Sequence, residues 1–138
     1  MADMLMLKII ALDRILYEGK ITQATMTTTA GDITILPNHM AIAAVLKDAP
    51  FILIDAKGEK HVVAIHGGYI TMIENAFLVV ADDAIFAEEI DEARVREDIR
   101  RNKEIIKDKK GSSLDITRAQ IQLQRNIMNL KISDTFRK

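Results

Sequence analysis

A change in residue pattern near residue 87 constrains the fold of this chain more than any other feature. Both prolines and five of the six glycines lie before that point, between short apolar and β-branched runs. Glycine and proline favour turns and interrupt regular segments, so this part is expected to form a series of short strands. After Asp91 the apolar residues recur at helical spacing instead. The sequence therefore predicts two parts of different fold, residues 1–86 and residues 87–138.

The first part is expected to be an antiparallel β-sandwich. Consecutive apolar strands can each bury one face only if two sheets stack on one another. An alanine-rich stretch, residues 40–46, is expected to be an irregular crossing because Pro50 follows closely. The predicted strands cover residues 4–12, 21–26, 32–36, 51–54, 61–65, 69–73 and 77–81.

The second part is expected to be an antiparallel two-helix hairpin. Asp91 is a suitable cap for a helix over residues 91–109, and a second helix is predicted over residues 114–130. The break between them, Gly111-Ser112-Ser113, is short, which favours antiparallel neighbours. The apolar stripes are narrow: Val95, Ile99 and Ile106 on the first helix, and Ile116, Ala119, Leu123, Ile127 and Leu130 on the second. Such a hairpin takes much of its stability from packing against other surfaces.

Charge is distributed unevenly along the chain. Residues 1–90 carry 6 basic and 12 acidic side chains, whereas residues 91–138 carry 13 basic and 8 acidic ones, giving net charges of −6 and +5. The basic half indicates either a solvated helical surface or a contact with an acidic partner or anionic ligand. There is no cysteine, and no run approaches the roughly 18 apolar residues of a membrane span. The apolar start also lacks the basic flank and cleavage site of a signal peptide.

Catalytic and metal chemistry are not expected. The three histidines, His39, His61 and His66, are not spaced as a ligand set, since His61 and His66 point to opposite faces of a regular strand. Gly67-Gly68 precedes a strand rather than a helix, so it is interpreted as a bulge and not a phosphate loop. No hydroxyl lies in a nucleophile elbow. A metal hydrolase using the three histidines remains an alternative that metal analysis would test.

Two similar strings open the predicted helices: Ile90-Asp91-Glu92-Ala93-Arg94 and Leu114-Asp115-Ile116-Thr117-Arg118-Ala119. In one interpretation each is a helix cap with an ion pair inside the first turn. In the other, the arginine holds phosphates and the helix start contacts a nucleotide base. The sequence leaves both interpretations open.

Several strings, in the same order, resemble the epsilon subunit of the F-type ATP synthase. Residues 29–39, Thr-Ala-Gly-Asp-Ile-Thr-Ile-Leu-Pro-Asn-His, resemble a turn-and-strand motif of that family, with Thr34 and Asn38 where it usually has glycine. Residues 63–70 resemble its apolar-Gly-Gly-aromatic strand. Further matches are Tyr17-Glu18-Gly19, residues 79–82 and residues 87–94.

The resemblance implies a non-catalytic rotor subunit. It would sit with the gamma subunit in the central stalk, on the c-ring, at the cytoplasmic face of the cell membrane. Its hairpin would reach the alpha/beta catalytic head and restrain ATP hydrolysis. Asp32 and His39 match family positions that contact the c-ring. No nucleic acid partner is implied. A free-standing sandwich adaptor that binds a peptide or sugar is the rival interpretation, and copurification would separate the two.

The resemblance also raises ATP as a regulatory ligand. Nucleotide-binding family members carry an Ile/Leu-Asp-x-x-Arg-Ala motif, and this chain has Ile90, Asp91 and Arg94 but Val95 in place of the alanine. Arg101 and Arg125 match further phosphate-facing arginines. Two departures are Ile85, where such members have glutamate, and Asn129, where they have arginine.

Overall fold

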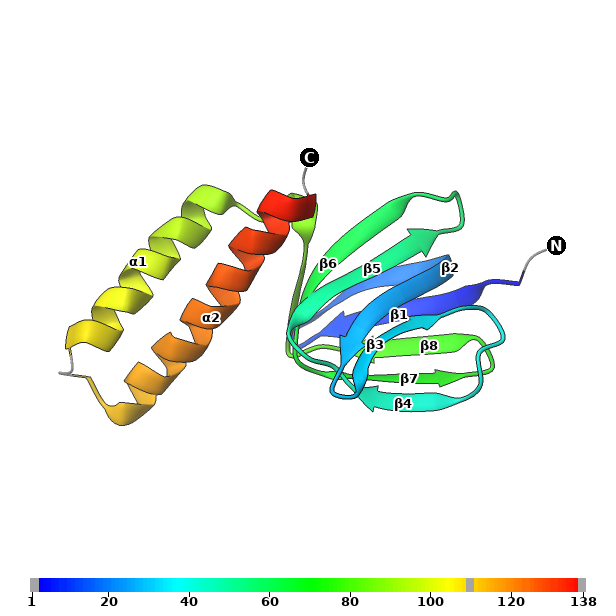
Figure 1. Ribbon diagram of the computed structural model, residues 1–138, viewed down its shortest axis with the longest axis horizontal. Coiled ribbons are helices and arrows are strands. Elements are labelled where there is room, and N and C mark those ends of the chain that lie inside the picture. The colour runs from blue at the N-terminus through cyan, green and yellow to red at the C-terminus, as the bar shows by residue number, and fades with distance from the viewer. Residues whose placement is uncertain (1–2, 109–110, 137–138) are drawn as a thin grey trace. The chain divides into compact units, whose positions relative to one another are not determined.

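The computed structural model describes residues 3–108 and 111–136. The chain divides into two compact units, Met1–Phe86 and Ala87–Lys138. Nine strands build the first unit, and a short 3-10 turn with two helices builds the second (Figure 1). The strands are β1 (Leu5–Ala11), β2 (Arg14–Thr28), β3 (Gly31–Ile35), β4 (Ile42–Val45), β5 (Ala49–Asp55), β6 (Lys60–His66), β7 (Tyr69–Ile73), β8 (Ala76–Val80) and β9 (Asp83–Phe86).

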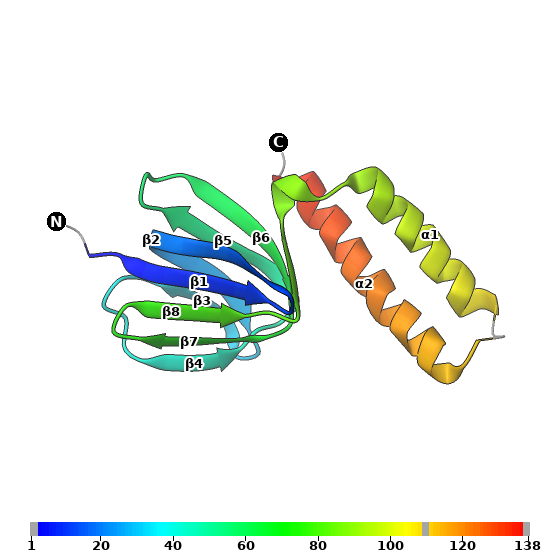
Figure 2. The ribbon, with the colours of Figure 1, turned by 180° about the vertical axis from the view of Figure 1, so that it is seen from behind.

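The long strand β2 connects the two layers of the sandwich. Its residues 14–21 pair with β1, whereas residues 24–28 pair with β3. A register irregularity between Ile21 and Gln23 marks the change. The sheet order is β4-β7-β8-β1-β2-β5-β6-β9, with β3 beside β2 (Figure 2). One pairing, β1 with β8, is parallel, and the others are antiparallel.

The predicted sandwich is confirmed, but the irregular crossing expected at residues 40–46 is wrong. Residues 42–45 form β4, which pairs antiparallel with β7. The small side chains of Ala43 and Ala44 do not oppose this pairing, and the burial along β4 alternates as it does in a half-exposed strand. The strand β9 was also not predicted, and it pairs with β6 from Val63 to His66.

Apolar side chains from both layers fill one core. Alternate residues of β1, namely Leu5, Leu7 and Ile9, are completely buried. Phe51 of β5 and Phe77 of β8 meet inside, with ring centroids 6.1 Å apart. Each such fully buried side chain stabilises the fold by about 1.5–3 kcal/mol relative to exposure. The core cluster and the side chains packed against it come from residues 5–86.

The second unit is the predicted helical hairpin. It comprises a 3-10 turn η1 (Ala87–Glu89), the helix α1 (Glu92–Asp108) and the helix α2 (Ser113–Phe136). The Asp91 carboxylate accepts a hydrogen bond from the backbone N–H of Arg94 at 3.2 Å, which is the predicted cap. The Ser112 hydroxyl accepts from the N–H of Asp115 at 3.1 Å and caps α2 in the same way. The predicted end of the first helix, Lys109, lies outside the described residues.

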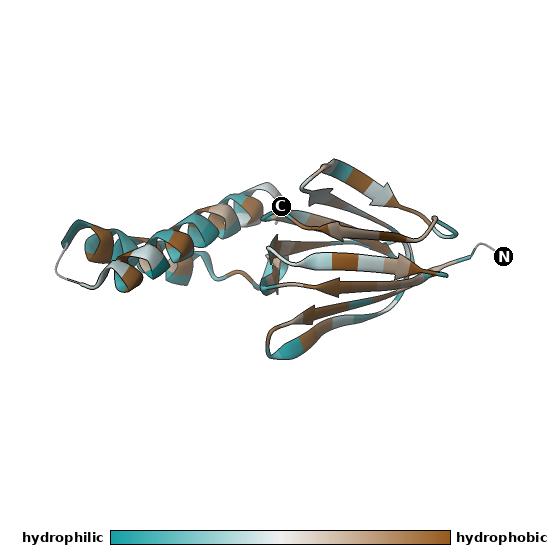
Figure 3. Cartoon of the chain, turned by 90° about the horizontal axis from the view of Figure 1, so that it is seen from below, coloured by the Kyte–Doolittle hydropathy of each residue, from teal (hydrophilic) through white to brown (hydrophobic). Residues whose placement is uncertain are grey.

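Apolar packing within the hairpin is thin. The helix α1 has no fully buried residue, and α2 has Ala119, Ile132 and Ser133. Val95 and Ile99 are only half-buried, and Ile127, expected inside the stripe, is 42% exposed. Figure 3 shows apolar residues alternating with polar ones along both helices. α2 continues to Phe136, six residues beyond the predicted end at Leu130. Within the residues described, neither helix is long and apolar enough to cross a membrane.

Candidate functional site

The strand β3 presents a free edge and carries Asp32, the first of the two residues predicted to contact a c-ring. In the described part of the chain, β2 is its only strand partner. Asp32, at its start, is exposed and accepts a hydrogen bond from the hydroxyl of Thr27 at 2.7 Å. A free edge offers backbone donors and acceptors to a second molecule. The edge strand β3 can therefore form backbone hydrogen bonds with a partner protein.

His39 lies in the loop after β3, at the other end of the strand from Asp32. The His39 backbone N–H donates to the Leu36 carbonyl at 3.2 Å, and the ring Nδ1 donates to the Met40 carbonyl at 2.7 Å. Leu36 and Met40 are 51% and 78% exposed. The structure does not bring Asp32 and His39 into one cluster. A partner that contacts both must follow the length of β3.

A second exposed surface is an apolar groove that sequence reasoning missed. It is an open groove of about 690 Å³ on the outside of β1, β2, β7 and β8. Met6 and Ile73, which line it, are 48% and 61% exposed. A Lys8–Glu18 ion pair of 3.6 Å also lies in its lining. The signal in the sequence is Met6, an apolar residue at an outward position of an alternating strand. Exposed apolar surfaces with polar rims mark interaction sites.

The residues predicted to bind ATP are spread over the helical hairpin, from the turn before α1 to the middle of α2. The Ile90 side chain is buried and the Asp91 carboxylate caps α1. The Arg94 side chain is exposed, while Arg101 forms an ion pair with Glu97 at 3.4 Å. Arg125, on α2, is half-exposed. The cap predicted by the first interpretation of Ile90–Arg94 is present, and the nucleotide interpretation remains a prediction.

The string that opens α2 lines a shallow pocket at the turn between the helices. Its volume is about 410 Å³. Asp115 and Arg118 of the string lie in its lining, opposite Asn102 and Asp108 of α1. Among the described residues of this lining, Arg118 is the one base and Asp108 and Asp115 are the two acids, so these residues by themselves give no excess of positive charge for a phosphate group.

The three histidines do not form a ligand set, because the structure separates them. His39 is in an exposed loop, His61 is near the start of β6, and His66 ends that strand with its side chain buried 3.6 Å from an Asp48 oxygen. The alternative of a three-histidine hydrolase therefore lacks its site.

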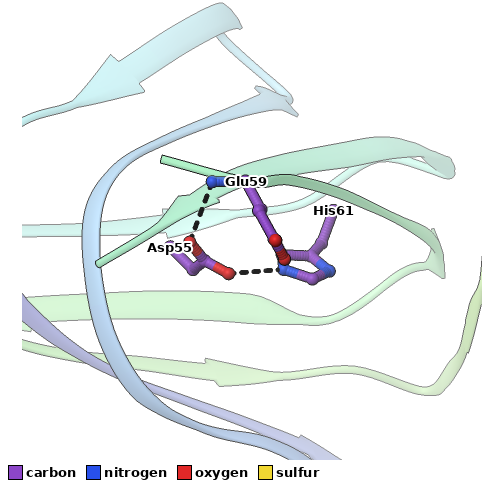
Figure 4. Close-up of side chains that lie close together, drawn as sticks. All are labelled: Asp55, Glu59 and His61. Atoms are coloured by element: carbon purple, nitrogen blue, oxygen red, sulfur yellow. Dashed lines mark hydrogen bonds and ion pairs between the residues drawn. The ribbon is translucent and has the colours of Figure 1, made fainter. Parts of the chain in front are cut away.

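His61 instead meets two carboxylates at the β5–β6 turn (Figure 4). Its Nε2 donates to Asp55 Oδ2 at 2.8 Å, while Asp55 Oδ1 accepts from the backbone N–H groups of Lys57 and Glu59. The hydrogen bond from His61 is the largest of the effects that lower the pKa of Asp55. Burial raises the pKa of the nearby Tyr17, and the Asp55 charge adds to this. Sequence reasoning missed this cluster.

Comparisons with known proteins agree with the two-part fold. Residues 4–87 match the family described as ATP synthase, Delta/Epsilon chain, beta-sandwich domain, and residues 88–134 match its long alpha-helix domain. The ATP synthase epsilon chain of Corynebacterium aurimucosum is 35% identical over 112 residues, covering 80% of this chain and 92% of that protein. The epsilon chain of Mycobacterium leprae is 39% identical over 97 residues, covering 70% and 80%.

Solved structures share the fold at low sequence identity. A chain in the Euglena gracilis mitochondrial ATP synthase, described as OSCP/F1/c-ring in rotational state 1, matches with a TM-score of 0.71 at 16% identity. The match covers 91% of this chain and 78% of that one. A chain of the Tetrahymena thermophila mitochondrial ATP synthase, described as central stalk/cring, matches with a TM-score of 0.56 at 14% identity, covering 96% and 98%.

A β-sandwich followed by a two-helix hairpin is the pair of domains that the two family models describe, so the fold and the matches together define a delta/epsilon-type subunit of an ATP synthase. The chain belongs to the ATP synthase delta/epsilon family, in which its curated relatives are epsilon chains.

Proposed function

We propose that this chain is a rotor subunit of the central stalk, which couples rotation to the c-ring and restrains ATP hydrolysis through its hairpin. Family membership over both units carries this proposal. The assembled enzyme would hold the chain peripherally, on the cytoplasmic side of the cell membrane. The rival interpretation as a free-standing adaptor loses its support, because the family likeness extends over the hairpin as well as the sandwich.

The c-ring contact runs along β3 in this proposal. Asp32 and His39 stand at the two ends of the exposed edge, so a broad partner can contact both while a small ligand cannot. A carboxylate and an imidazole pair with basic or carbonyl groups on polar loops. Leu36 and Met40 add apolar area between and beside them.

The gamma subunit would cover the groove around Met6 and Ile73. The groove is apolar, and a permanent stalk contact buries more apolar surface than a transient one. The Lys8–Glu18 pair in its lining provides polar groups that fix the orientation of the partner. Covering Met6 and Ile73 would remove two exposed apolar side chains from water.

The hairpin would act as the regulatory element that reaches the alpha/beta head. No residue of α1 is fully buried, so apolar burial does not lock the hairpin in one arrangement. Its net charge of +5 over residues 91–138 suits an acidic partner surface. ATP would favour one arrangement only by binding it better, and Asp91, Arg94, Arg101 and Arg125 with Ile90 are the residues predicted to provide that preference.

Deletion of residues 89–138 tests the regulatory part. The assembled enzyme with the shortened chain should hydrolyse ATP faster and still synthesise it. Equal rates of ATP hydrolysis by the full and the shortened assemblies would contradict the regulatory role of the hairpin. Copurification of gamma with the tagged full chain tests the stalk assignment separately, and failure to recover any synthase subunit would contradict it.

A further inference from the structure

Three potential ligand groups converge at the turn between β5 and β6. Asp55, Glu59 and His61 each contribute one ligand atom, and these atoms lie within 4.8 Å of one another. Figure 4 shows both carboxylate side chains on the same side of the turn as the imidazole ring, beside the nitrogen that bonds to Asp55. The proposed stalk function uses none of these residues.

The turn holds Asp55 in a fixed orientation. Its Oδ1 accepts two backbone hydrogen bonds, from Lys57 at 2.8 Å and Glu59 at 2.9 Å. The Asp55 N–H donates to the Glu59 carbonyl at 2.8 Å and closes the turn. Only Oδ2 is then directed at His61 Nε2, 2.8 Å away. Hydrogen bonds of this kind to a carboxylate orient the ligands of metal sites.

The imidazole ring is also held in place by its neighbours. The rings of Tyr17 and Phe86 lie with their centroids 6.5 Å from that of His61, on two further strands. The side chains of His61 and Asp55 still retain 28% and 17% exposure, so an ion and its water ligands can reach them. The site is ordered on the protein side and open on the solvent side.

We propose that Asp55, Glu59 and His61 bind a divalent cation of the zinc class, which replaces the proton between His61 Nε2 and Asp55 Oδ2. Zinc–nitrogen and zinc–oxygen bonds of about 2.0–2.2 Å with tetrahedral angles place ligand atoms roughly 3.4 Å apart. The present separation of 2.8 Å has to open by a few tenths of an ångström. Glu59, on the exposed turn, has to move closer.

The donor set determines the class of ion. A neutral imidazole with two carboxylates suits zinc, cobalt or nickel, whereas magnesium and calcium prefer oxygen donors alone. The two carboxylates balance the charge of the dication, and water completes the tetrahedron. Asp55 belongs to β5 and His61 to β6, so a bound ion would link these two strands. Such an ion would stabilise the folded sandwich by mass action.

Calorimetric titration of the full chain with zinc chloride tests the site, with magnesium chloride as the comparison ion. We expect one zinc per chain, and at least about tenfold weaker binding by His61→Ala. Glu59→Gln should weaken zinc binding, whereas the matched variant Glu74→Gln, in the exposed β7–β8 turn, should bind zinc as the unaltered chain does. Magnesium should give no comparable binding.

Nuclear magnetic resonance of the unaltered chain gives a readout that does not depend on a variant folding correctly. Zinc should shift the His61 Nε2 resonance at one equivalent, before the resonances of the other two histidines move. Unchanged zinc affinity in His61→Ala, equal loss in Glu74→Gln, or a first response at His39 or His66 would each overturn the proposal.

Discussion

The hydroxyl of Ser133 on α2 donates a hydrogen bond to Glu92 Oε1 on α1 at 2.9 Å, across 41 residues of sequence. Ser133 is completely buried, and it is one of the few residues of the hairpin that are. This polar contact joins the first turn of α1 to the last turns of α2. Apolar packing between the helices is thin, so we expect this contact to contribute to holding them together.

Replacing Ser133 with alanine should therefore loosen that end of the hairpin. A hydrogen bond to a charged group contributes about 1.5–3 kcal/mol, and the partial exposure of Glu92 places the expected loss at the lower end. Amide hydrogen exchange at residues 130–136 would show faster exchange. Thr135→Ala, at an exposed position on the same turn, is the control. Equal exchange in both variants would mean that the contact does not hold the helices together.

Gly68 occupies a position where any side chain would be strained and would clash with the backbone. Its φ is +117°, and a Cβ added there would lie 2.1 Å from the Val80 carbonyl oxygen. Gly68→Ala should destabilise the sandwich by about 3 kcal/mol or more, since backbone strain and a backbone clash add. Gly58→Ala is the control, because Gly58 has φ +84° but open space around it, so strain alone acts there. Chemical denaturation of both variants measures the difference, and similar losses would contradict the clash.

Glu97 gives the hairpin a dependence on acid. The hydrogen bond from Arg100 is the main cause that holds its pKa below the ordinary value of 4.5. A carboxyl with a lowered folded pKa contributes stability above its unfolded pKa, and loses it as the pH falls through the folded pKa. Circular dichroism should thus show helix content falling below about pH 4.5, with less of this loss in Glu97→Gln. High salt should reduce the difference, because the pair is exposed.

Residues 1–88 should fold without the hairpin. The core cluster and its packed neighbours come from residues 5–86, so removing the helices leaves the cluster complete. We expect cooperative denaturation of the shortened chain, with a steepness in keeping with its smaller buried surface. Gradual, non-cooperative unfolding would show that the helices supply essential packing.

The sequence predicts those parts of the fold in which one residue pattern dominates. Alternation in β1 and the turn residues around β6 to β8 place the strands, and Asp91 places the first helix cap. The strand β4 was missed because Ala43 and Ala44 carry no β-branched signal, and its pairing with β7 decides its conformation.

The candidate sites are predictable only in part, for a related reason. Asp32 and His39 follow from a motif, but their separation along an edge strand depends on the pairing of β3. Asp55 belongs to β5 and His61 to β6. Their contact depends on the register between these two strands, in which Ile54 pairs with Lys60. Spacing in the sequence alone did not indicate that register.

The parallel pairing of β1 with β8 has a consequence for synthesis of the chain. Met6 aligns with Ala76 and Ile10 with Val80. β1 is a central strand and is synthesised first, but its neighbour β8 is translated only about seventy residues later. Contacts of such long sequence separation close slowly. On the ribosome, the N-terminal strand therefore keeps one side uncovered for most of translation, and the sandwich closes only when β8 emerges from the exit tunnel.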